Sequence, residues 1–112
     1  MNKDCIFCSI AEKKINSDIV YEDEKIVAFK DINPVAPVHI IIIPKQHIKS
    51  ISEVKDFSII SHIAKASIEI AEKFNVKDSG FRLVTNCGPD GGQTVFHLHF
   101  HFLGGKSLEF TC

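Results

Sequence analysis

The sequence predicts an α+β domain in which an antiparallel sheet of about five strands packs against one long helix, with a short helix near the N-terminus. Short runs of β-branched residues alternate with turn residues, and a single long segment has helical apolar periodicity. The elements follow the order α-β-β-β-α-β-β. Because the connections are short, neighbouring strands are expected to run antiparallel.

The strands are assigned from apolar and β-branched runs bounded by turn residues. They span residues 18–21, 25–30, 38–43, 80–86 and 97–103. The run VHIIII at 38–43 is nearly all apolar, so both faces of this strand are expected to be covered. The short helix is expected over residues 5–13, where Ile6 and Ile10 share an apolar side.

The long helix is expected from about Val54 to Asn75. Its apolar residues fill roughly 200° of the helix circumference, about twice what contact with one sheet face requires. A second packing surface is therefore expected, and in so small a domain we favour another subunit. Ile59, Ala66 and Ile70 are the candidates for that interface, whereas His62 is expected on the solvated polar arc.

Length and charge exclude several classes of protein. The 112 residues, of mass 12.5 kDa, fit one domain spanning 1–112. A net charge of −1 gives no basic balance for nucleic acid binding. The longest apolar stretch, 40–43, is too short to cross a bilayer, and the opening residues MNKDCIFC lack the apolar core of a signal peptide. A cytoplasmic protein without nucleic acid or membrane partners is expected.

Three histidines alternate with apolar residues in the segment 97–101, HLHFH. On a strand their imidazoles project from one face about 6.6 Å apart, while Leu98, Phe100 and Phe102 point into the core. An ordinary half-exposed strand would use Thr, Lys or Glu on its polar face. Two chemistries fit the histidines better: a catalytic zinc ion shared by neighbouring imidazoles, or attack on phosphorus by one imidazole.

The segment 86–94, NCGPDGGQT, precedes the histidines and is rich in glycine. Glycines let the backbone approach a ligand closely and let successive N–H groups form a concavity that suits an anion. Gln93 and Thr94 add side-chain donors. Such a loop is also typical of a plain connection, but one that leads directly into three histidines favours a phosphate site over a bare metal site.

Residues 91–105, GGQTVFHLHFHFLGG, resemble the signature of the histidine triad (HIT) superfamily, in its Hint branch. The resemblance continues through 29–34 and 37–48 and covers essentially the whole chain. It implies a HIT-like fold and a purine nucleoside phosphoramidase or nucleotidyl hydrolase that acts at the α-phosphorus through a nucleotidyl-histidine. The implied partner is a purine nucleotide or nucleoside phosphoramidate, such as an AMP conjugate, and no cofactor is required for catalysis.

The resemblance also implies roles for individual residues. His99 is the nucleophile, His101 contacts phosphate oxygens or the departing group, and His39 lies beside the nucleophile. A core histidine in an isoleucine-rich strand explains His39 equally well. The implied phosphate contacts are Asn86, Gly92, Gln93, Thr94, His99 and His101. The implied nucleoside pocket consists of Asp31, which binds the ribose hydroxyls, and Ile6, Phe7, Ile10, Phe29 and Ile32, which surround the purine.

Cys5 and Cys8 have the C-x-x-C spacing of a zinc or redox site, and they could equally be two buried apolar thiols. The redox interpretation is weak because a redox motif follows a strand, and only four residues precede Cys5. The resemblance to bacterial HIT proteins implies a structural zinc ion held by Cys5, Cys8, His47 and His97. No role is predicted for Cys87 or Cys112.

A nucleotide-binding regulatory or scaffold protein with incidental turnover is the alternative to an enzyme. The intact triad favours catalysis, because a pocket used only for binding would not need His99. The resemblance further implies a homodimer formed through the long helix. An apolar pocket reads mainly the shape of a base, so the sequence does not distinguish adenosine from guanosine.

Overall fold

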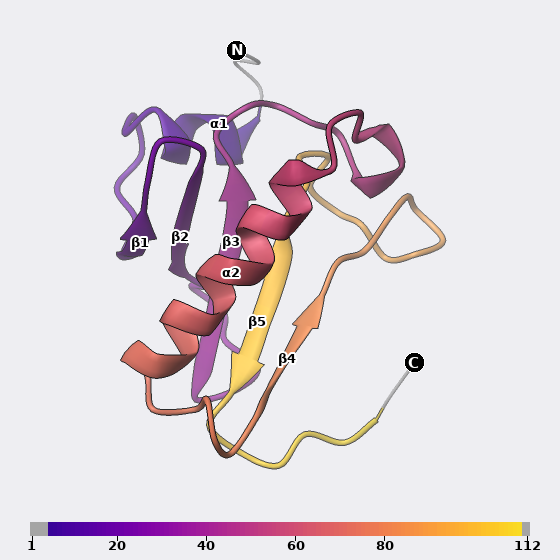
Figure 1. The fold of residues 1–112 in the computed structure, drawn as a ribbon. Coiled ribbons are helices and arrows are strands. Elements are labelled where there is room, and N and C mark those ends of the chain that lie inside the picture. The colour runs from indigo at the N-terminus through magenta and orange to yellow at the C-terminus, as the bar shows by residue number, and fades with distance from the viewer. Residues whose placement is uncertain (1–4, 111–112) are drawn as a thin grey trace.

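Five antiparallel strands form one sheet in the order β1-β2-β3-β5-β4 (Figure 1). The structure is a computed structural model that describes residues 5–110, so Cys112 lies outside the described residues. Along the chain the elements are α1 (Ile6–Ala11), β1 (Ile19–Glu22), β2 (Ile26–Lys30), β3 (Val38–Pro44), the 3-10 helix η1 (Ile51–Glu53), α2 (Ser58–Lys73), β4 (Phe81–Val84) and β5 (Phe100–Gly104). The predicted α+β class, with one long and one short helix, is confirmed. None of the helices in this part of the chain has the length and hydropathy that crossing a bilayer requires.

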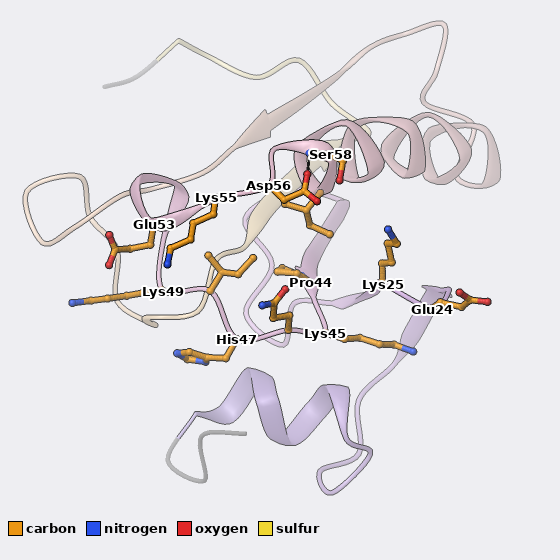
Figure 2. A pocket seen from close by; sticks show the side chains of 13 residues that line it. Glu24, Lys25, Pro44, Lys45, His47, Lys49, Glu53, Lys55, Asp56 and Ser58 are labelled. Atoms are coloured by element: carbon orange, nitrogen blue, oxygen red, sulfur yellow. Dashed lines mark hydrogen bonds between the residues drawn. The ribbon is translucent and has the colours of Figure 1, made fainter.

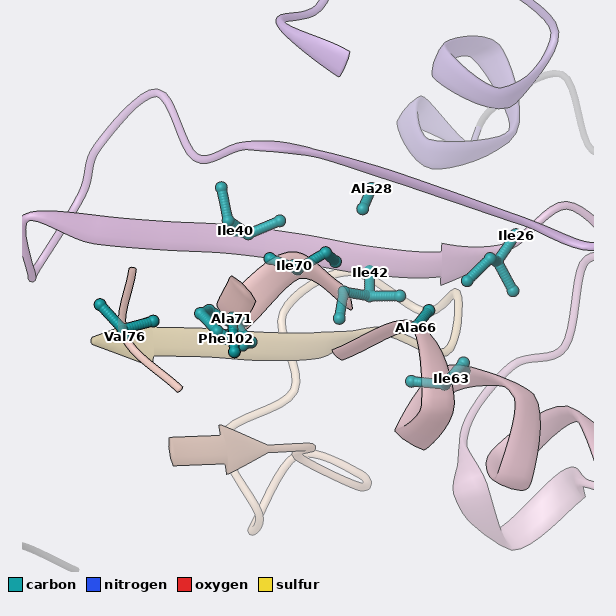
Figure 3. Packing of buried hydrophobic residues seen from close by; sticks show 10 residues of the cluster. All are labelled: Ile26, Ala28, Ile40, Ile42, Ile63, Ala66, Ile70, Ala71, Val76 and Phe102. Carbon is teal, nitrogen blue, oxygen red and sulfur yellow. The ribbon is translucent and has the colours of Figure 1, made fainter. Parts of the chain in front are cut away.

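β3 is buried on both faces, as its apolar sequence predicts. Ile40, Ile41, Ile42 and Ile43 are each at most 3% exposed. Because side chains alternate along a strand, Ile40 and Ile42 pack in one core with α2, and Ile41 and Ile43 pack in a second core with α1. Figure 3 shows the first of these cores, with Phe102 of β5 against α2.

The last strand begins at Phe100, so the prediction that it starts at residue 97 is wrong. In the ladder with β3, Phe100 pairs with Ile42, and the register ends there. Two residues further along β3 is Pro44, which has no N–H to donate to a ladder. The Pro44 carbonyl oxygen instead accepts a hydrogen bond from His97 Nε2, at 2.8 Å. Residues 97–99 are thereby released from the sheet.

α2 covers Ser58–Lys73, a shorter span than the predicted 54–75. It begins where the Asp56 carboxylate accepts a hydrogen bond from the Ser58 N–H, at 3.0 Å, which satisfies one of the orphan donors of the first turn. It ends before Asn75, whose φ of 58° is left-handed and breaks the helical path.

The residues predicted for a subunit interface do not lie on the outer face of α2. Ala66 and Ile70 are in the core of the same chain, at 2% and 1% exposure, and Ile59 packs against that core. On the outer side the large apolar residues are Phe57 and Ile68, which are 60% and 47% exposed. These two side chains are on one side of the helix but about three turns apart, and neither is among the residues predicted for the interface.

His62 is partly exposed, with 35% of its side chain accessible to solvent, and it also makes a contact that its place on the polar arc did not predict. Its Nε2 lies 2.6 Å from the Asp23 carboxylate, which also accepts a hydrogen bond from the Tyr21 hydroxyl at 2.9 Å. Burial raises the pKa of Asp23, but hydrogen bonds from the Lys25 and Ile26 N–H groups, His62 and Tyr21 lower it to about 2. This cluster ties α2 to the turn between β1 and β2.

Candidate functional site

The triad histidines lie on the face of the sheet opposite α2. His101 pairs with Ile41 across β3 and β5, and directly opposite residues point to the same face, which is that of the α1 core. His97 and His99 contact the ring of Phe7, from α1, at centroid distances of 6.0 and 4.9 Å. Their exposed fractions are 0% and 6%, so both rings are buried.

The hydrogen bonding of His99 fixes its tautomer. Its Nδ1 lies 2.8 Å from the His97 carbonyl oxygen, which can only accept, so Nδ1 carries the proton. Burial lowers the pKa of His99, and the opposing effects of the His97 carbonyl and Asp31 are smaller. The ring is therefore neutral at pH 7, with a lone pair on Nε2 that can attack an electrophile.

A second chain of hydrogen bonds fixes the tautomers of His39 and His101. The Val35 N–H donates to His39 Nδ1 at 3.1 Å, so the proton of His39 is on Nε2. That nitrogen lies 3.0 Å from His101 Nδ1, which therefore accepts, and 3.4 Å from Asp31 Oδ2. Burial and the two neighbouring histidines, His99 and His39, lower the pKa of His101 to about 4. His101 is thus a neutral ring whose Nε2–H can be donated to a ligand.

The three triad imidazoles do not converge on one point. The ring of His97 lies beside Cys5 Sγ, and the ring of His99 bonds to the His97 carbonyl. The ring of His101 bonds to His39. A catalytic zinc ion shared by the triad therefore finds no support in this geometry. One ligand atom each of Asp31, His39 and His101 lie within 4.8 Å of one another, but the hydrogen-bond chain already accounts for both nitrogens of His39.

The glycine-rich loop folds back on itself before it reaches the triad. The Asn86 side-chain amide donates to the Gly91 carbonyl at 2.7 Å, and the Gly92 N–H donates to the Pro89 carbonyl at 3.0 Å. A Cβ at Gly91 would lie 2.3 Å from the Cys87 carbonyl oxygen, so this turn requires glycine.

Two side chains of the loop have opposite environments. Thr94 is exposed, so its hydroxyl is accessible to a ligand. Gln93 is 5% exposed; its Oε1 accepts from the Gly88 N–H, and its Nε2 donates to the carbonyls of Lys49 and Val95, at 2.8 and 3.1 Å. Gln93 thus holds the loop against the segment that follows β3, and contact between its side chain and a phosphate stays a prediction.

The apolar residues predicted around the nucleoside fall into two groups. Phe7, Ile10 and Phe29 are buried in the α1 core, with the two phenyl rings 5.7 Å apart. Ile6 and Ile32 are 49% and 91% exposed. Of the five apolar residues predicted for the nucleoside pocket, Ile6 and Ile32 therefore have most of the accessible surface that a ligand could cover.

The predicted metal ligands come together. One ligand atom each of Cys5, Cys8, His47 and His97 lie within 4.8 Å of one another. His97 Nδ1 is 3.3 Å from Cys5 Sγ and 3.5 Å from Cys8 Sγ, and His47 Nδ1 is 3.3 Å from Cys8 Sγ. Sulfur and nitrogen ligands of one tetrahedral zinc ion are about 3.6 Å apart, given Zn–S and Zn–N lengths of about 2.3 and 2.0 Å. Two thiols and two imidazoles at this spacing fit a zinc ion.

Several groups that the sequence analysis did not single out orient these side chains. The Pro44 carbonyl holds the ring of His97, and the Val35 N–H orients His39. The Thr85 hydroxyl donates to the His99 carbonyl at 2.7 Å. Backbone groups have no sequence signature, so only Thr85, a hydroxyl residue directly before the glycine-rich loop, could have been found in advance.

A groove of about 680 Å³ lies beside the metal-ligand cluster (Figure 2). It is lined by residues 44–49, by Glu24 and Lys25, and by parts of 53–59. His47 is the one member of the cluster that lines it, and no triad histidine does. The groove is therefore separate from the face on which His99 and His101 lie.

Comparison with protein families and curated proteins assigns this chain to a known group. Residues 4–110 match the family described as "Scavenger mRNA decapping enzyme C-term binding". Over 110 residues the chain is 46% identical to an uncharacterized HIT-like protein of Rickettsia prowazekii, covering 96% of this chain and 92% of the relative. An uncharacterized HIT-like protein of Buchnera aphidicola is 45% identical over 106 residues, covering 93% of this chain and 95% of that protein.

Solved structures agree with these matches. A histidine triad protein from Clostridium difficile is 47% identical, with a TM-score of 0.97 and coverage of 99% of this chain and 98% of that one. A HIT family hydrolase from Clostridium thermocellum is 46% identical, with a TM-score of 0.95 and the same coverage. A histidine triad nucleotide-binding protein from Candida albicans is 27% identical, with a TM-score of 0.84 and coverage of 97% and 84%. This chain belongs to the histidine triad (HIT) family.

Proposed function

We propose that the chain is a purine nucleoside phosphoramidase or nucleotidyl hydrolase that works through a covalent nucleotidyl-His99 intermediate. The observation that carries the proposal is the state of His99, a buried neutral ring with its Nδ1–H held by a carbonyl and its Nε2 lone pair available. Two relatives have names that support an enzyme acting on nucleotides. The Clostridium thermocellum protein is called a hydrolase, and the Candida albicans protein is called a nucleotide-binding protein.

In the first step His99 Nε2 attacks the α-phosphorus and the bond from phosphorus to the leaving nitrogen breaks. The departing amine takes one proton from solvent. The His101 Nε2–H donates to a nonbridging phosphate oxygen, where charge accumulates in the transition state. In the second step water attacks phosphorus, the bond to His99 breaks and one proton returns to solvent, so protons balance over the cycle.

Recognition of the nucleoside is proposed to use both sides of the triad. Asp31 accepts hydrogen bonds from the ribose hydroxyls, and its Oδ1 already accepts the Asn33 N–H at 2.7 Å, which fixes the carboxylate. Ile6 and Ile32 cover the purine, and Thr94 and the loop N–H groups contact the phosphate. A nucleotide-binding protein with incidental turnover is the alternative, in which the same pocket binds without chemistry.

A zinc ion bound by Cys5, Cys8, His47 and His97 would have a structural role, because it would cross-link α1 to the segment that carries the nucleophile. Protein atoms fill all four positions of such a site. The ring of His97 belongs to this cluster, and its carbonyl oxygen accepts from His99, so the cluster and the nucleophile share one residue.

The hydrogen-bond chains predict one tautomer for each ring in the site. Long-range ¹H–¹⁵N spectra at pH 7 are expected to show the Nδ1–H form for His99 and the Nε2–H form for His39 and His101. Val35→Pro removes the N–H that orients His39, and should convert part of the His39 population to the other tautomer. A wild-type His101 in the Nδ1–H form would contradict the proposed donor role.

Removing the nucleophile should abolish turnover. His99→Ala is expected to lower kcat on an adenosine phosphoramidate at least about 1,000-fold, as loss of covalent catalysts does in other enzymes, and to leave nucleotide affinity largely unchanged. Rapid quenching of wild type should trap a chain heavier by one nucleotidyl group, attached to His99. His62→Ala, which removes a histidine from the opposite side of the sheet, is the control. Near-normal turnover by His99→Ala, or an adduct on another residue, would refute the mechanism.

Acid should inactivate the protein at a lower pH than the one that protonates a free imidazole. Because burial lowers the pKa of His99, the ring stays unprotonated at pH values where a free imidazole is already charged. On a nitrophenyl ester of AMP, whose leaving group needs no proton, kcat/KM is expected to fall at acid pH with a midpoint below that of a free imidazole, about 6.5. A midpoint at or above about 6.5 would show that His99 is not the titrating nucleophile.

Elemental analysis of protein prepared without chelators should find about one zinc per chain. Cys8→Ser should lose the metal and lower the free energy of unfolding by several kcal/mol, because metal binding is part of folding. Cys87→Ser, which changes an exposed cysteine outside the cluster, is the matched control and should keep full occupancy. Metal-free wild type of unchanged stability would exclude a structural zinc site.

A homodimer in which a second copy covers Phe57 and Ile68 is proposed, because both large apolar side chains are exposed on one side of α2 and its N-cap. Sedimentation at micromolar concentration is expected to give about twice the chain mass of 12.5 kDa. Ile68→Lys should shift the species to the monomer, whereas Ile15→Lys, at a site 43% exposed near α1, should not. A wild-type monomer would reject the dimer.

A further inference from the structure

The four residues of the Cys/His cluster are not equally enclosed. His97 and Cys8 are 0% and 1% exposed, and Cys5 is 8% exposed. His47 is only half-buried and is one of the residues that line the groove beside the cluster (Figure 2). A small molecule can therefore reach His47 from solvent, whereas Cys5, Cys8 and His97 are buried.

The two histidines also differ in what holds their second nitrogen. His97 Nε2 donates to the Pro44 carbonyl at 2.8 Å, which fixes the ring. Within residues 5–110, the partners of the His47 ring are Cys8 Sγ, at 3.3 Å from Nδ1, and the ring of His97, at a centroid distance of 5.0 Å. No group of this part of the chain holds His47 Nε2. A metal-binding histidine is ordinarily oriented through its second nitrogen, and loss of that partner weakens its ligation.

The backbone that carries His47 adds to this difference. Cys5 caps α1, where its sulfur accepts the Cys8 N–H at 3.4 Å, and Cys8 is within the helix itself. His47 lies in the connection between β3 and η1, in neither a helix nor a strand. The backbone on both sides of His47 is held by hydrogen bonds, from the Lys45 N–H to the Lys25 carbonyl and from the Leu98 N–H to the Ile48 carbonyl, so exchange requires movement of the His47 side chain and not opening of the connection.

We infer that His47 is the exchangeable ligand of the cluster, and that the groove is the route by which a metal ion enters and leaves. The inference rests on the metal site proposed above. When His47 swings into the groove, Cys5, Cys8 and His97 keep the ion, and an incoming donor atom takes the position that His47 leaves. The site is then open to exchange with small metal-binding molecules while the rest of the fold stays intact.

Zinc release from the loaded full-length chain to an excess of 4-(2-pyridylazo)resorcinol, a coloured chelator, tests the route. Release through the groove requires the chelator to take the place of His47, so the rate should rise with chelator concentration. The rate should also exceed that of global unfolding, measured by hydrogen exchange of the β3 amides. A release rate that is independent of chelator concentration and equal to the unfolding rate would overturn the inference.

Cobalt substitution tests the ligand. Cobalt-loaded His47→Ala should show altered visible ligand-field bands, and added imidazole should enter through the groove and restore the wild-type spectrum. His47→Ala should also release metal about tenfold faster or more than wild type. Gln46→Ala, a neighbouring change in the same groove, is the control and should keep the wild-type spectrum and rate. Failure of imidazole to restore the spectrum, with the variant still folded by circular dichroism, would overturn the inference.

The two proposals fail in different ways. If wild type binds neither zinc nor cobalt, the proposed metal site itself is wrong and the exchange route falls with it. If wild type binds one ion and releases it only on unfolding, the metal site stands and His47 is not its exchangeable ligand.

Discussion

Two hydrogen bonds of His97 connect the parts of this molecule on which its chemistry depends. Its Nε2–H donates to the Pro44 carbonyl at the end of β3, and its own carbonyl oxygen accepts the Nδ1–H of His99. The first bond ends the pairing of β5 with β3, because it uses the carbonyl of a residue that has no N–H for a ladder. The second sets the tautomer of the ring proposed as the nucleophile. His97 thus lies at the end of the β3–β5 pairing and sets which nitrogen of His99 is available.

The imidazoles next to His97 are kept neutral by burial. Desolvation is the largest influence on the pKa values of His39, His99 and His101, and it lowers all three, although Asp31 acts in the opposite direction on each. Neutral rings can be ordered by hydrogen bonds in a way that charged rings cannot, because each neutral ring has one donor and one acceptor nitrogen. A single backbone N–H, that of Val35, is therefore enough to set the direction of the chain through His39 to His101.

The two faces of the sheet differ in the kinds of residue that cover them. The α2 side is a closed apolar core that includes Phe102, fully buried and stacked on Phe81 at 4.6 Å, and it needs no polar partner. The α1 side combines apolar packing with the triad and the Cys/His cluster, and its short helix has only six residues. A helix of that length is marginal by itself, so the packing of Phe7, Cys8 and Ile10 in this core explains how it stays against the sheet.

The sequence by itself determined the α+β class, the buried central strand, the grouping of Cys5, Cys8, His47 and His97, and the family. The class and the buried strand follow from period and composition, which are local properties of the chain, whereas the grouping and the family follow from the resemblance to HIT proteins. It did not determine that Ala66 and Ile70 face inward, because a wide apolar arc on a helix does not show which part of the arc meets the sheet. It also did not determine that the last strand starts at Phe100, because an alternating pattern does not show where strand pairing ends. It also could not assign tautomers, since backbone carbonyls and N–H groups look alike at every position of a sequence, or the contact of His62 with Asp23, which is 39 residues away. Only the tertiary structure decided these features, because each depends on contacts between residues far apart along the chain.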